Sequence, residues 1–199
     1  NISFDELTKS YYEQSNGLLD GGVDCFLVET VFDTLNCKAA LFAIQTLFTD
    51  KKKNIPILVS GTITDASGRT LSGQTVEAFW YSIRHANITA VGLNCALGAE
   101  QMRPWLSELS LIADIPIFAY PNAGLPNEFG EYDQTPKEMS KIIKSFAKDG
   151  LVNIVGGCCG TTPKHISKIN EEVDEIKPRK IPINETITRL SGLEPLTIR

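Results

Sequence analysis

Five short apolar segments recur along the chain, each followed by a helical pattern, and no other feature constrains the fold as strongly. The segments are rich in β-branched residues and start about 30 residues apart, as the strands of successive βα units do. A parallel sheet built from such units is therefore expected, with strands at residues 25–28, 55–60, 89–93, 116–120 and 151–155.

A TIM-type (β/α)₈ barrel has eight such units, whereas this sequence contains five. We therefore expect an α/β fold that is an incomplete TIM-type barrel, made of about the last five βα units. Residues 1–176 would form the C-terminal part of that barrel. Residues 177–199 are punctuated by proline and lack helical periodicity, which predicts a linker. An unclosed parallel sheet leaves strand edges uncovered, so we expect the chain to be a piece of a longer protein.

The composition is that of an ordinary globular protein, with 42% hydrophobic and 22% charged residues. The formal net charge of -5 argues against nucleic acid and against an anionic membrane as partners. No apolar run is long enough to cross a bilayer. The five cysteines are an odd number in a chain that is large enough to fold without disulfides. Reduced thiols of a cytoplasmic protein, either buried or bound to metal, are therefore expected.

Polar side chains and thiols follow each of the expected strands. Because the C-terminal ends of parallel strands meet on one face of a barrel, these residues should lie close together. They are Glu29, the turn at 60–62, Asn94 with Cys95, Asn122, and Cys158 with Cys159. The glycines that flank the vicinal cysteines allow the bent backbone that two neighbouring thiols need to reach one centre. Three of the five cysteines are thus expected to meet.

Three convergent thiolates suit a zinc ion, because three protein ligands leave the fourth tetrahedral position free for a substrate. Three thiolates also give the site a net negative formal charge, so the metal would polarise water poorly. It would still hold a substrate sulfur as a nucleophilic thiolate near neutral pH. The residue pattern therefore favours alkyl transfer to a substrate thiol over hydrolysis.

Simpler interpretations apply to the same cysteines. Cys25 falls on an expected buried strand and Cys37 on the apolar stripe of a helix, so both are expected to be core residues. Cys158 and Cys159 are also compatible with buried thiols or with a vicinal redox pair.

The polar candidates have simpler interpretations too. Glu29 is compatible with a cap of the following helix, and Asn122 with a residue that only forms its turn. His85 and His165 lie on expected helices away from the strand ends, where surface or packing roles are expected.

Three motifs resemble the homocysteine S-methyltransferase family, whose barrel binds zinc and homocysteine. They are GLNCALG at 92–98, YPNAGLP at 120–126 and GGCCGTTP at 156–163, and the likeness extends from residue 1 to about residue 173. Within the family, three further segments are typical of the cobalamin-dependent methionine synthases: SGTITD at 60–65, SGQT at 72–75 and RLSGLEPL at 189–196. The last of these resembles the passage from the homocysteine barrel to a folate-binding domain.

The resemblance implies specific roles for the candidate residues. Cys95, Cys158 and Cys159 match the family's zinc ligands, and homocysteine would bind at the fourth position through its thiolate. Glu29 matches a glutamate that holds the amino-acid end of homocysteine. Asn122 matches an asparagine beside the metal, able to occupy the open position when substrate is absent.

The resemblance further implies zinc and methylcobalamin as cofactors and methionine as the product. The cobalamin domain and the folate domain would belong to the same parent polypeptide. The family's glycine-rich motif on the first strand is absent from this sequence, so turnover by this segment alone is not expected. Two alternatives stay open: a stand-alone methyltransferase that uses S-methylmethionine or betaine, and a structural-zinc or thiol redox protein.

Overall fold

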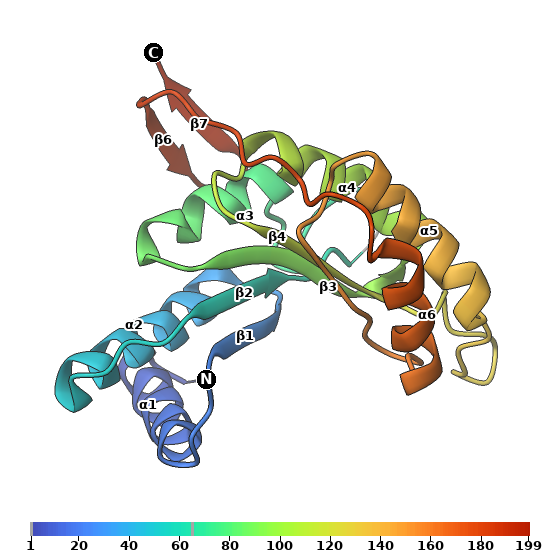
Figure 1. Cartoon of the computed structure of the whole chain (residues 1–199). Coiled ribbons are helices and arrows are strands. Elements are labelled where there is room, and N and C mark those ends of the chain that lie inside the picture. The colour runs from blue at the N-terminus through green and yellow to red at the C-terminus, as the bar shows by residue number, and fades with distance from the viewer. Residues whose placement is uncertain (1, 65) are drawn as a thin grey trace.

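The computed structural model describes residues 2–64 and 66–199. Its strands are β1 (Phe26–Val31), β2 (Ile57–Gly61), β3 (Ala90–Gly98), β4 (Ile117–Asn122), β5 (Ile154–Val155), β6 (Thr188–Ser191) and β7 (Pro195–Ile198). Its helices are α1 (Phe4–Asp20), α2 (Thr34–Lys51), α3 (Val76–Ile83), the 3₁₀ helix η1 (Arg84–Ala86), α4 (Ala99–Ile112), α5 (Pro136–Lys148) and α6 (Pro163–Val173). Figure 1 shows the main sheet with these helices packed around it.

The main sheet contains five strands in the order β1-β2-β3-β4-β5, and every neighbouring pair is parallel. The expected succession of βα units is therefore confirmed. The sheet matches part of a TIM-type barrel, and no closed barrel forms from the described residues. Asn1 and Asp65, which belong to the expected barrel segment and to the 60–65 motif, lie outside the described residues.

Several strands differ from their expected extents. β3 continues to Gly98, so Asn94 and Cys95 lie within it and not after its end. Glu29 lies inside β1 and not after its end, because pairing with β2 continues to Val31. β5 contains only two residues, and Ile154 is 38% exposed. The apolar run at 151–155 is therefore not one buried strand. Leu151 and Val152 are buried but do not pair with β4, and the pairing begins only at Ile154.

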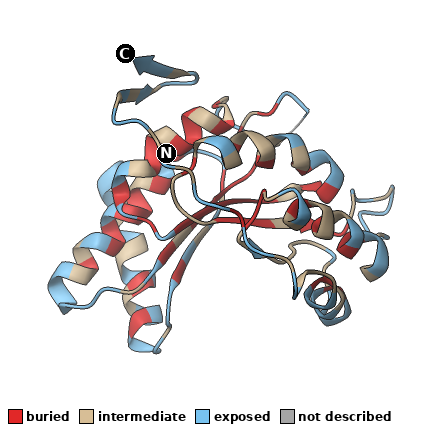
Figure 2. Ribbon diagram, turned by 45° about the horizontal axis from the view of Figure 1, so that its top comes forward, coloured by how far each residue is buried: buried red, intermediate tan, exposed pale blue. Residues whose placement is uncertain are grey.

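The strand register divides the sheet into two faces, because residues paired across parallel strands point to the same side. One face is packed against the helices and supplies the strand part of the core: Phe26, Ile57, Val59, Val91, Leu93, Ile117 and Ala119. The other face, here called the inner face, carries polar residues such as Ser60 and Asn94. Its members also include Leu27, Gly92, Phe118, Tyr120 and Ile154. Figure 2 shows buried residues along the strands and on the helix sides that face them.

Helix starts follow the local sequence signals. Ser3 and Glu6 form a capping box at α1, and Thr135 and Glu138 form another at α5. Thr162 precedes α6, and Pro163 stands in the first turn of this helix. Proline lacks a backbone N–H, but an N–H at this position would have no partner within the helix. These signals fix the residues at which α1, α5 and α6 begin.

The segment after α6 packs on the barrel segment. Arg179 is buried, and its guanidinium donates hydrogen bonds to the backbone oxygens of Ser110, Ala113 and Ile115. Farther on, β6 and β7 form an antiparallel hairpin beside α3, visible near the C-terminus in Figure 1. The hairpin was not expected from the sequence. That residues 177–199 link two domains stays a prediction.

Of the two cysteines expected in the core, only one is there. Cys37 is 1% exposed on α2 and belongs to the core cluster. Cys25 is exposed, because β1 begins one residue after it. Assigning Cys25 to the core was therefore wrong. No helix in the described part of the chain is both long enough and apolar enough to cross a membrane.

Candidate metal centre

Three thiols from two distant parts of the sequence meet at the C-terminal edge of the sheet. The Sγ of Cys95, on β3, lies 3.6 Å from the Sγ of Cys159, which in turn lies 4.0 Å from the Sγ of Cys158. All three sulfur atoms lie within 4.8 Å of one another. Each cysteine is half-buried, as a site that admits a substrate requires. The expected convergence of these thiols is confirmed.

The loop that carries Cys158 and Cys159 is held by backbone hydrogen bonds to the end of β4. The N–H of Cys158 donates to the oxygen of Pro121 at 2.8 Å, and the N–H of Ala123 donates to the oxygen of Cys159 at 2.9 Å. Gly160 follows with φ of 76° and lies against Tyr132, where a Cβ would come within 2.3 Å of the Tyr132 Cβ. Glycine is thus required here for both backbone conformation and space.

Cys95 reaches the cluster through an unusual backbone conformation. Cys95 and Ala96 have φ values of 60° and 54°, and Thr30 near the end of β1 has 60°. Non-glycine residues rarely adopt this left-handed region, and each costs on the order of 1–3 kcal/mol. Such residues concentrate at functional sites, where the surrounding structure holds them in place.

The cysteine geometry fits a tetrahedral metal. Zinc–sulfur bonds of ~2.3 Å at tetrahedral angles place two sulfur atoms about 3.8 Å apart. Two of the three sulfur–sulfur separations, 3.6 and 4.0 Å, lie on either side of that value, and the third is within 4.8 Å. Within residues 2–64 and 66–199, these cysteines form the one cluster of three or more metal-ligating side chains. Three thiolates with one open position match a catalytic zinc better than a structural one.

The metal-free centre favours protonated sulfur at Cys158. Burial, followed by contact with the thiols of Cys95 and Cys159, raises the pKa of Cys158 to about 12. Burial and then a hydrogen-bonding contact with Cys159 likewise raise the pKa of Tyr132. A divalent cation would reverse this preference, because it stabilises thiolates directly.

Asn94 is a contributor whose role was not recognised in the sequence. Its side chain is fully buried next to the cluster, and its Nδ2 donates to the Sγ of Cys158 at 3.9 Å. The available signal was an asparagine inside a strongly apolar strand, directly before a cysteine. A buried carboxamide needs partners for both of its ends, which points to a structured polar site.

The two polar candidates lie differently with respect to the cluster. Asn122 is 1% exposed, and its Oδ1 accepts a hydrogen bond from the N–H of Cys159 at 3.0 Å. Glu29 lies on β1, and its charge adds to burial in raising the pKa of Tyr120 on the inner face. The next residue, Thr30, donates its N–H to Asn94 at 3.1 Å. Asn122 is therefore in contact with the cysteine loop, and Glu29 is one residue away from a partner of Asn94.

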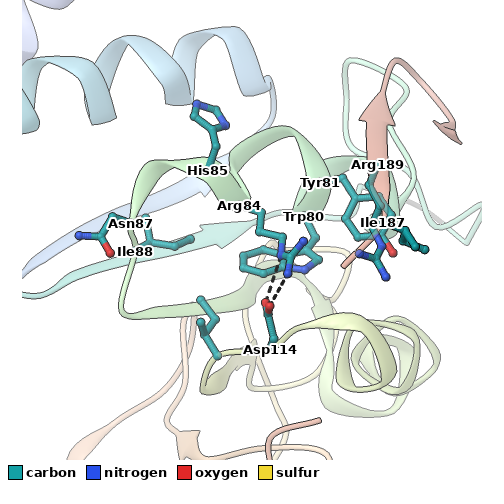
Figure 3. Close-up of a pocket in the computed structure, with 10 residues that line it drawn as sticks. Trp80, Tyr81, Arg84, His85, Asn87, Ile88, Asp114, Ile187 and Arg189 are labelled. Atoms are coloured by element: carbon teal, nitrogen blue, oxygen red, sulfur yellow. Dashed lines mark hydrogen bonds and ion pairs between the residues drawn. The ribbon is translucent and has the colours of Figure 1, made fainter. Parts of the chain in front are cut away.

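A pocket of about 540 Å³ lies at the opposite ends of the strands. Its lining residues precede β3 and β4 or belong to α3, η1 and the tail, and Arg84 forms an ion pair there with Asp114 (Figure 3). His85 lines this pocket and is exposed. His165 is buried and bonds Thr162 and the oxygen of Gln134, so it is a helix-capping residue. Neither histidine belongs to the cysteine cluster.

Solved structures with a similar fold include homocysteine methyltransferase MmuM from Escherichia coli. Its apo form matches at a TM-score of 0.65 and 20% identity, covering 86% of this chain and 58% of that one. Its metallated form matches at a TM-score of 0.65 and 20% identity, covering 86% and 52%. At this identity the likeness shows the fold. The present chain spans little more than half the length of those chains.

The family model described as homocysteine S-methyltransferase matches residues 1–173, a stretch that includes all three clustered cysteines and both polar candidates. The match covers most of the 199 residues. The chain belongs to the homocysteine S-methyltransferase family.

Proposed function

We propose that this protein binds zinc through Cys95, Cys158 and Cys159 and activates the thiol of homocysteine for methylation to methionine. The observation that carries the proposal is the sulfur cluster, whose spacing suits one tetrahedral ion. Zinc, when bound, would hold the substrate sulfur as a thiolate at neutral pH. The family match supports the substrate class.

The remaining tasks fall to residues of the chain itself. The carboxylate of Glu29, whose charge acts on Tyr120 of the inner face, suits the ammonium group of homocysteine, because a charged hydrogen-bonded pair orients an amino acid strongly. Asn122 supports the Cys159 backbone and borders the centre. Tyr132 and the half-buried cysteine loop limit the access of water to the sulfur. These residues bind and orient the substrate, and they keep its sulfur in a partly dry site.

For the methyl donor we propose methylcobalamin, held by another domain of the same polypeptide, with a folate domain beyond it. The motifs at 60–65, 72–75 and 189–196, which are typical of cobalamin-dependent methionine synthases, support this donor. The alternative donors are S-methylmethionine and betaine. Supplying each donor to the full-length protein with homocysteine, and measuring methionine, separates these cases.

Metal analysis of cysteine variants tests the centre itself. Cys95→Ala, Cys158→Ala and Cys159→Ala should each lower bound zinc from about one ion per chain to almost none. Cys25→Ala and Cys37→Ala are matched controls that remove a thiol elsewhere and should keep the zinc. Undiminished zinc in the three site variants would refute the ligand assignment. A disulfide between Cys158 and Cys159 in freshly purified, zinc-free protein would favour a redox function instead.

A further inference from the structure

The carboxamide of Asn94 joins three strand ends on the inner face. Its Oδ1 accepts hydrogen bonds from the Thr30 N–H at 3.1 Å, the Ser60 hydroxyl at 2.8 Å and the Thr62 hydroxyl at 3.3 Å. The residue is 0% exposed, so no solvent competes for these bonds. The oxygen end of the side chain is therefore fully occupied by donors from β1 and from the end of β2.

The nitrogen end of the same carboxamide faces the cysteine cluster. Its Nδ2 donates to the Thr30 hydroxyl at 2.9 Å and to the Cys158 sulfur at 3.9 Å. The orientation of the amide follows from its partners, because the backbone N–H of Thr30 can only donate and so must meet the oxygen. The N–H group is thus directed at the sulfur.

The residue that follows Asn94 and one of its hydrogen-bond partners both have a left-handed backbone conformation. Cys95 follows directly in a left-handed conformation, and Thr30, bound at both ends of the carboxamide, is also left-handed. Such backbone conformations persist only where surrounding contacts hold them. The bonds to Asn94 fix both the end of β1 and the point from which the Cys95 side chain departs.

We propose that Asn94 is a positioning residue for the metal ligands, which holds the Cys158 sulfur through a hydrogen bond and fixes the direction of Cys95. This inference rests on the proposed function, since it concerns the ligands of the same zinc.

Paired substitutions in the full-length protein test the proposal. Asn94→Asp keeps an oxygen toward Thr30, Ser60 and Thr62 but turns an acceptor toward the sulfur. The control is Asn153→Asp, because Asn153 also bridges backbone groups, accepting from Ile117 and donating to Arg179, at the other end of the strands. Zinc affinity, measured by competition with a chromophoric chelator, should fall by about 10- to 100-fold in Asn94→Asp. In Asn153→Asp it should stay within about 3-fold of the unaltered protein. Equal affinities in the two variants would overturn the proposal.

If Asn94→Asp fails to fold, nuclear magnetic resonance of the unaltered protein tests whether Asn94 bonds the Cys158 sulfur. In protein loaded with cadmium-113, scalar coupling should reach the side-chain amide protons of Asn94 across the Cys158 sulfur. Couplings to the cysteine Hβ protons without any to Asn94 would overturn the inference while leaving the metal site intact. Failure of the unaltered protein to bind zinc would overturn the proposed function, and this inference with it.

Discussion

The Sγ atoms of Cys95 and Cys159 lie 3.6 Å apart although 64 positions separate the two residues in the sequence. A metal bound by both would connect β3 directly to the loop between β5 and α6, although β4 lies between β3 and β5 in the sheet. The metal would therefore act on folding as well as on chemistry, because the unfolded chain does not keep these thiols together.

Removal of zinc should lower the stability of the protein. A ligand that binds only the folded state at 100 times its Kd adds about 2.7 kcal/mol to the free energy of unfolding. Urea denaturation with added zinc, compared with the same titration in a chelator, measures the difference. Cys95→Ala is the control, since it should unfold identically in both media. A response of Cys95→Ala equal to that of the unaltered protein would place the zinc elsewhere.

Thiol accessibility should divide the five cysteines into three classes. Cys25 is exposed and should react at once with a chromogenic disulfide. Cys37 is buried, and burial raises its pKa to about 12, so it should react only after unfolding. The three clustered thiols should be protected by zinc and become reactive when a chelator is added. Five fast thiols in the zinc-loaded protein would contradict the metal assignment.

Glu29→Gln should weaken homocysteine binding by roughly 10- to 100-fold, because a charged hydrogen bond to the substrate ammonium is lost. Zinc content should not change, since Glu29 is not expected to contact the metal. Isothermal titration measures the first quantity and metal analysis the second. The control is Glu13→Gln on the exposed part of α1, which should bind homocysteine normally. Loss of zinc from Glu29→Gln would show that Glu29 has a different role.

The ion pair between Arg84 and Asp114 should make stability depend on pH in the acid range. The hydrogen bond from Arg84 lowers the pKa of Asp114 below its ordinary value of 3.8. A lowered carboxyl pKa stabilises the folded state above the unfolded value, and this contribution is lost as the pH falls through the folded pKa. Asp114→Asn should thus be less stable than the unaltered protein at pH 7, and the gap should close in acid. Asp24→Asn, on an exposed turn, should show no such gap at either pH.

Much of the architecture follows from local sequence signals. The apolar runs at 55–60, 89–93 and 116–120 predicted β2, β3 and β4, and capping residues such as Thr135 marked the helix starts. These features depend on contacts that are near in sequence or on a periodicity that the sequence displays directly. The meeting of the clustered thiols was also predictable, because Cys95 lies in the C-terminal half of β3 and the vicinal cysteines follow β5 in the same parallel sheet.

Other features depend on tertiary contacts that leave little trace in the sequence. Cys25 was expected in the core because the strand was expected to begin at residue 25. In the structure β1 begins at Phe26, and Cys25 is exposed. The hairpin of β6 and β7 is stabilised beside α3, where the Ser191 hydroxyl donates to the oxygen of Ala78. The part played by Asn94 rests on partners from β1 and β2 and from the loop of Cys158. None of these contacts has a periodic or local signature.

The most direct test of the proposed function is the number of protons released when homocysteine binds to the zinc-loaded, full-length protein. Calorimetric titration near pH 7 in buffers of different ionisation enthalpy gives that number. A free thiol is mostly protonated at this pH, so capture of its sulfur as a thiolate should release about one proton per site. Binding with release of about one proton, abolished in Cys159→Ala, is the predicted result. Binding without proton release, or unchanged after zinc removal, would contradict activation of the thiol by the metal.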